Sequence, residues 1–134
     1  MSVGRYNFLI YGIKSDDYHE FVPKSEKDSY YGQEKIVHAV EVDDIWKLED
    51  NDFRKDPKLV ILQDGYDGSY SILGILLKYV GNIEYGDGDF NEVITKNQID
   101  FLHGELEKRL LEQNIDLNNY DPINIGLITI THYT

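Results

Sequence analysis

Four aspartates beside glycines are the residues whose spacing comes closest to that of a metal site. Asp64 and Asp67 lie in one acidic loop, and Asp87 and Asp89 lie in a second. Carboxylate oxygens next to flexible glycines are the donors from which calcium sites are built. The second loop lacks the rest of an EF-hand loop, including the glutamate at its twelfth position. Asp-Gly pairs also supply the positive φ of tight turns, so we interpret them as turns and predict no metal or cofactor.

Other residues that could carry out catalysis are missing or isolated. The absence of cysteine excludes a thiol nucleophile, a disulfide and a zinc-thiolate site. The sequence also lacks a phosphate-binding lysine loop, G-x-S-x-G, H-E-x-x-H, and G-x-G-x-x-G after a strand. No two of the four histidines (His19, His38, His103 and His132) have the spacing of a helical metal pair. His38 and His132 lie on predicted strands and could approach each other across the sheet. We therefore expect a protein that is not an enzyme.

Acidic and aromatic side chains together predict a binding surface. The chain has 11 tyrosines and a formal net charge of −12. Exposed aromatics are enriched in interfaces, and carboxylates around them select a basic partner. The predicted contact residues are Asp43, Asp44, Glu49, Asp50, Asp52, Asp64, Tyr66, Asp67, Tyr85, Asp87, Asp89 and Phe90. The simpler alternative is a solvated acidic surface with tyrosines packed on the sheet.

The charge distribution excludes some classes of partner. Residues 36–134 carry nineteen acids and eight bases, whereas residues 1–35 are nearly balanced. Direct nucleic-acid binding is not expected, because its affinity comes largely from Lys and Arg on phosphates. We expect no membrane contact either, since no run approaches the roughly 18 apolar residues of a span and no signal peptide is visible. These observations predict a cytoplasmic protein with a basic protein partner.

The elements that position these residues are predicted from periodicity and turn signals. We expect a first strand at Tyr6–Ile13, a long loop at Lys14–Gln33 and a second strand at Lys35–Val42. The pair Asp43-Asp44 is typical of a helix N-cap, and it precedes a short apolar helix. Leu59–Leu62 and Tyr70–Val80 form a β-hairpin around two Asp-Gly pairs, and Gly74 marks a bulge or bend.

The last third of the chain predicts one helix and one strand. Thr95 and Gln98 fit a capping box at the start of a helix that ends near Asn114. Its apolar stripe consists of Ile99, Leu102, Leu106, Leu110 and Ile115. The last strand is Ile123–Tyr133. We predict a single α+β domain over residues 1–134, with one mostly antiparallel sheet and one long amphipathic helix, about residues 95–114, on one face. An open edge at the last strand would permit a homodimer.

Two segments give the chain a resemblance to a known group. Tyr6–Lys14 and Asp64–Tyr70 are similar in style to stretches of small acidic bacteriophage and prophage proteins, and the Ile-, Asn-, Lys- and Tyr-rich usage fits an AT-rich genome. The resemblance covers about a fifth of the chain and implies no functional residue. It implies an inhibitor of a host enzyme in a bacterial cytoplasm, such as a defence protein, and in some cases a DNA mimic.

We therefore expect a non-enzymatic acidic inhibitor that binds a basic surface of a host defence or nucleic-acid-processing protein. One alternative is a protein that sequesters a nucleotide-like ligand. Tyr66, Tyr85 or Phe90 would stack on the base, and the available cations are Arg5, Lys14, Arg54 and Lys55. A metal-dependent hydrolase with paired carboxylates is the remaining alternative.

Overall fold

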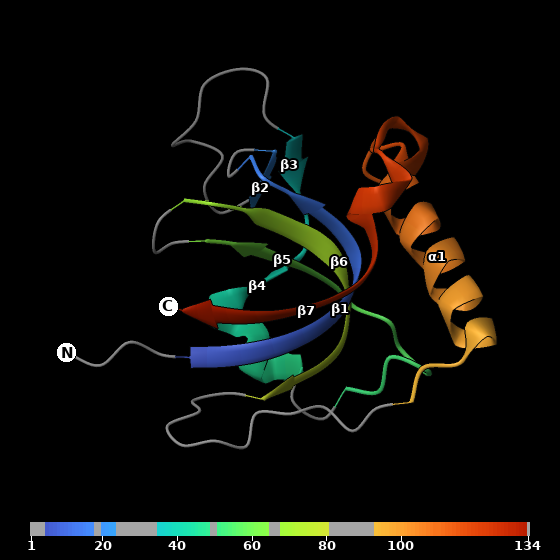
Figure 1. Ribbon diagram of the computed structural model, residues 1–134, viewed down its shortest axis with the longest axis horizontal. Helices are drawn as coiled ribbons and strands as arrows, with labels where there is room; N and C mark the ends of the chain where they lie inside the picture. Colours follow the sequence, from blue (N-terminus) through green and yellow to red (C-terminus); the bar gives the residue numbers. More distant parts are fainter. Residues whose placement is uncertain are drawn as a thin grey trace.

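A five-stranded sheet forms the centre of the molecule in the computed structural model, which describes residues 5–17, 20–23, 35–48, 51–64, 68–80 and 93–133 (Figure 1). Its strand order is β4-β5-β6-β1-β7. The bounds are Arg5–Ser15 for β1, Val40–Glu41 for β4, Leu59–Gln63 for β5, Ser71–Val80 for β6 and Ile125–Tyr133 for β7. β5, β6, β1 and β7 are antiparallel neighbours, whereas β4 runs parallel to β5.

The α+β class is confirmed, but the sheet is mixed rather than mostly antiparallel. The predicted strand Lys35–Val42 is divided into β3 (Lys35–Val37) and β4, which belong to different sheets. His38 lies between them, and its backbone N–H and C=O both bond the side chain of Gln113, at 2.7 and 2.9 Å. Because the Gln113 side chain is hydrogen-bonded to both backbone groups of His38, these groups cannot join the backbone hydrogen-bond ladder of a sheet.

A second, two-stranded parallel sheet takes one of its strands, β2 (Phe21–Pro23), from the segment predicted to be a loop. β2 pairs with β3, and both ends of β1 extend beyond the predicted strand. Residues 18–19 and 24–33 of the predicted loop lie outside the described residues. The pair Asp43-Asp44 does not precede its helix, because the 3-10 helix η2 begins at Val42 and ends at Leu48. Ile45 and Leu48 are both buried there, and their spacing of three matches the 3-10 period.

The predicted hairpin is confirmed, with β5 and β6 paired from Leu59 opposite Ile75 to Gln63 opposite Ser71. The bulge is not at Gly74. The register between β1 and β6 shifts between Leu9 and Ile10, where Leu9 pairs with Lys78 and Ile10 with Leu76. Leu77 is therefore the extra residue of the bulge.

Gly74 has a different role, which is to let two strands approach closely. It lies opposite Gly12 of β1, and a Cβ atom on either glycine would lie 2.6 Å from the Cα atom of the other. Gly12 also pairs with Gly126 of β7, where an added Cβ would meet nothing within 4 Å. Space for a side chain is therefore lacking at Gly12 and Gly74, where β1 and β6 approach, but not at Gly126 of β7.

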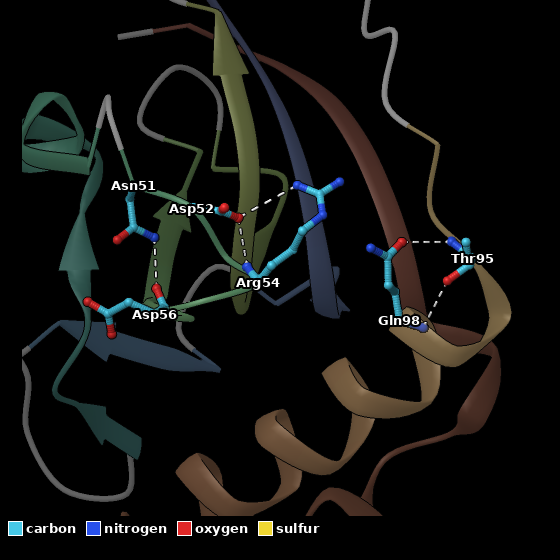
Figure 2. A network of polar contacts seen from close by, with 6 residues as sticks. All are labelled: Asn51, Asp52, Arg54, Asp56, Thr95 and Gln98. Carbon is cyan, nitrogen blue, oxygen red and sulfur yellow. Dashed lines mark hydrogen bonds and ion pairs between the residues drawn. The ribbon is translucent and has the colours of Figure 1, made fainter.

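The helix α1 (Lys96–Leu111) covers one face of the sheet, where Leu102, Leu106 and Leu110 are fully buried (Figure 1). They pack on alternate residues of the central strands, and η2 contributes Ile45 and Leu48 to a second core on the opposite face. Figure 2 shows the confirmed capping box: the Gln98 N–H donates to Thr95 Oγ1 at 3.2 Å, and the Thr95 N–H donates to Gln98 Oε1 at 2.9 Å.

The end of α1 comes three residues before the predicted one. Asn114 follows in the left-handed conformation, with a φ of 62°, and the Ile115 N–H bonds the Leu110 carbonyl at 2.9 Å. This geometry is typical of a helix C-terminus. Two short 3-10 turns, η3 (Leu117–Asn119) and η4 (Pro122–Asn124), then lead into β7, which begins at Ile125 rather than Ile123. Among the described helices, none has the length and apolar character needed to cross a membrane.

Candidate functional site

The predicted acidic and aromatic surface falls largely outside the described side chains. Asp43 lies in η2, but its side chain is among those that the structure does not describe. The other predicted residues outside the described part are Glu49, Asp50, Tyr66, Asp67, Tyr85, Asp87, Asp89 and Phe90. The surface formed by these residues stays a prediction.

The three remaining predicted contact residues lie in three different parts of the chain, and each has a local partner. Asp44 of η2 is exposed and pairs with Lys47 Nζ at 3.4 Å. Asp52 accepts a hydrogen bond from the Arg54 backbone N–H at 2.9 Å and pairs with its guanidinium at 3.6 Å. Asp64 is only 8% exposed, and its carboxylate accepts the Ser69 N–H at 3.1 Å. Asp64 therefore holds the hairpin turn, as the turn interpretation predicts.

A pocket of about 230 Å³ lies beside Asp52, between the turn that follows η2 and the bulged part of β6. Its lining is Leu48, Asn51, Asp52, Phe53, Arg54, Leu76, Leu77, Lys78 and Tyr79. Figure 2 shows how the turn is held: Asn51 Nδ2 donates to the Asp56 carbonyl at 2.8 Å, and Asp52 bonds Arg54. The guanidinium of Arg54 also lies 4.5 Å from the ring centre of Phe53, within cation–π distance.

The charge of this pocket differs from that of the whole chain. Arg54 and Lys78 bring two positive charges to it, and Asp52 is the one acid in its lining. The volume is below the roughly 300–1,000 Å³ of pockets for drug-sized ligands, so it fits a small anion or a single ring. Arg54 is among the cations predicted from the sequence to be available for a ligand, whereas Lys78 is not. The available signal was a lysine within the apolar run of β6.

Tyr11 and His103 form a polar contact between β1 and α1. The Tyr11 hydroxyl lies 2.8 Å from His103 Nδ1, and the rings meet edge to face at 6.0 Å. Burial raises the pKa of the Tyr11 hydroxyl above its usual value, and the nearby Asp100 carboxylate raises it further. The hydroxyl therefore stays protonated at neutral pH and is a poor general base. This contact orients His103, for which the sequence indicated no partner.

One end of the molecule brings together acidic side chains from two segments of the chain. The segments 15–23 and 111–125 hold three acids each and no Lys or Arg: Asp16, Asp17, Glu20, Glu112, Asp116 and Asp121. The Tyr120 hydroxyl donates to Glu20 Oε1 at 2.9 Å, and the Tyr120 ring lies 5.8 Å from that of Phe21. Figure 1 shows β2 and the turns after α1 at the same end of the molecule. We call these two segments the acidic end.

The acidic end also has an apolar component and rigid support. Ile123 is 83% exposed and Leu111 is 53% exposed. Asp116 and Asp121 are the N-caps of η3 and η4, accepting the backbone N–H groups of Asn118 and Ile123 at 2.9 and 3.1 Å. The carboxylates are thus held in place by their own turns. None of the acids of this region is among the contact residues predicted from the sequence.

No group of three or more His, Asp or Glu residues among those described has the arrangement of a metal site. Comparison with family models, with curated proteins and with solved structures finds no significant match for this chain.

Proposed function

We propose that this chain is a non-enzymatic binding protein that inhibits a host protein by covering a basic surface on it. The observation that carries the proposal is the acidic end, whose two segments contain six acids and the exposed side chain of Ile123. Fixed carboxylates speed the encounter with a basic surface and reject acidic ones. An exposed apolar side chain next to them adds buried area once the surfaces meet.

The class of partner follows from the charge. Proteins that bind nucleic acid carry dense Lys and Arg for phosphate contacts, so a strongly acidic surface competes for the same groups. A defence or nucleic-acid-processing protein of a bacterial host is the partner that fits, and the resemblance to phage proteins points the same way. Because exposed charges contribute to this contact, binding weakens as salt rises.

Neutralising variants test the proposal without disturbing the turns. Asn is as good an N-cap as Asp, so Asp116→Asn with Asp121→Asn removes two charges and keeps both caps. The matched control, Asp56→Asn with Asp100→Asn, removes two exposed charges elsewhere. The wild-type chain is first used to capture its partner from nuclease-treated bacterial lysate at low and high salt, with identification by mass spectrometry.

Binding of each variant to the purified partner then decides between outcomes. We expect roughly tenfold weaker binding for the acidic-end variant, since two exposed charges contribute about 0.5–1 kcal/mol each. The control variant should stay within about twofold of wild type. Equal effects of the two variants, or binding that is insensitive to salt, would contradict the proposal. Inhibition is checked by the partner's activity on nucleic acid with and without the chain.

The pocket beside Asp52 favours a second candidate function, the sequestration of a small anionic ligand such as a nucleotide or its phosphate. Arg54 and Lys78 would meet the anion, and Phe53 and Tyr79 offer aromatic contacts. Thermal-shift screening against nucleotides and inorganic phosphate tests it. A stabilisation that Lys78→Gln removes and Lys55→Gln, outside the pocket, retains would support this function. A flat response across the set would dismiss it.

A further inference from the structure

β7 ends the strand order of the main sheet, and no strand among the described residues pairs with its outer edge. It is nine residues long, and its pairing with β1 continues through nine residues without a register shift. Natural edge strands are protected from pairing by charges, proline, bulges or short length. Within its own residues β7 has no Asp, Glu, Lys, Arg or proline, it shows no register shift against β1, and it is not short.

The composition of β7 is unusual for this chain. Asp, Glu, Lys and Arg make up 28% of the residues, yet Ile125–Tyr133 contains none of them and no proline. Leu127, Thr129 and Thr131 are exposed on the helix side of the strand, and Leu127 is 43% exposed. Ile128 and Ile130 are half-buried on the opposite side, where they pack against the second core. A strand added at the outer edge of β7 would lie beside both of these rows of side chains.

We propose that β7 pairs with β7 of a second copy of this chain, antiparallel and centred on Thr129. In this register Thr129 faces its own counterpart and Ile128 faces Ile130 of the second copy, twice over because of the two-fold axis. Leu127 faces Thr131 of the second copy. Centring on Ile128 would instead place Gly126 opposite Ile130 and lose an apolar pair. The hydrophobic pattern therefore selects one register.

Self-complementarity favours a second copy over an extended segment of another protein, because in this register Ile128 meets Ile130 on both sides of the two-fold axis. β7 offers no carboxylate to select a basic segment and no cation to select an acidic one. Two copies that each carry −12 repel one another, and an uncharged strand is where they can approach at least cost. Salt screens this repulsion, so the dimer strengthens as salt rises. This dependence is opposite to that expected for the basic partner, and it separates the two proposals.

The absence of cysteine makes the register directly testable, because one introduced cysteine can form a disulfide only with a second copy. Residues directly opposite on antiparallel strands have Cα atoms about 4.5–5.5 Å apart, within disulfide range. Thr129→Cys should therefore give a covalent dimer under mild oxidation. Thr131→Cys is the matched control, because its two copies would lie about 13 Å apart along the strand direction.

Two further measurements complete the test. A mixture of Leu127→Cys and Thr131→Cys chains should form the mixed disulfide in preference to either homodimer. Sedimentation equilibrium of the wild-type chain should show twice the chain mass, with the dimer fraction rising with protein concentration and with salt. Equal cross-linking by Thr129→Cys and Thr131→Cys, or a single-chain mass at the highest concentration, would overturn the proposal.

Discussion

Adding one methyl group at Gly12 should destabilise the protein, whereas the same change at Gly126, its neighbour on β7, should not. A Cβ on Gly12 would lie 2.4 Å from the Leu73 carbonyl oxygen and 2.6 Å from the Cα of Gly74. Both are backbone atoms of a central strand, so relief requires β1 and β6 to separate. At Gly126 no atom lies within 4 Å of the added Cβ.

The expected magnitudes follow from two opposing effects. Overpacking costs about 1–3 kcal/mol, and the upper value applies here because backbone cannot rotate away. Replacing Gly by Ala restricts the unfolded chain and returns about 0.4–1 kcal/mol. Gly12→Ala should therefore lower the free energy of unfolding by about 2 kcal/mol, while Gly126→Ala should raise it slightly.

Urea unfolding followed by far-ultraviolet circular dichroism measures both variants. With a slope of about 1–3 kcal/mol per molar urea, Gly12→Ala should lower the midpoint by about 1 M. Gly126→Ala should raise it by a few tenths molar. If the two midpoints shift equally, or if Gly12→Ala leaves the midpoint unchanged, the close approach of β1 and β6 does not exist as described.

Three other changes have defined outcomes. Leu106→Ala should cost about 2–5 kcal/mol because Leu106 is fully buried, whereas Leu111→Ala, on the exposed side of α1, should cost less than about 1 kcal/mol in the same urea assay. Thr95→Ala should cost about 1 kcal/mol through loss of the capping box, and Thr95→Ser, which keeps the hydroxyl, should cost little. The raised pKa of Tyr11 means that the folded state holds this proton more tightly than the unfolded state. Its contribution to stability is therefore complete below about pH 10 and is lost as the pH rises above that value. Between about pH 8 and 11, the free energy of unfolding should fall less steeply with pH for Tyr11→Phe than for wild type. An unchanged slope would show that Tyr11 has its usual pKa.

The sequence by itself predicted the elements whose signals are local. The hairpin follows from apolar β-forming runs around Asp-Gly pairs, and the start of α1 follows from Thr95 and Gln98, three residues apart. The buried stripe of α1 also follows from spacing alone, because residues three or four apart share a helix face. These features need only neighbours along the chain, and their predicted existence is confirmed.

Only the tertiary structure decided the features that depend on contacts between distant residues. Gln113 interrupts the predicted strand Lys35–Val42 from 75 residues away, and this interruption places β3 and β4 in different sheets. Gly12 and Gly74 permit a close approach only because the strand order places β1 beside β6. The acidic end and the pocket beside Asp52 likewise combine segments that no local pattern connects. Local propensity decides which elements form, but the pairing of surfaces across the fold decides which side chains meet, and that pairing is not encoded in any short stretch of sequence.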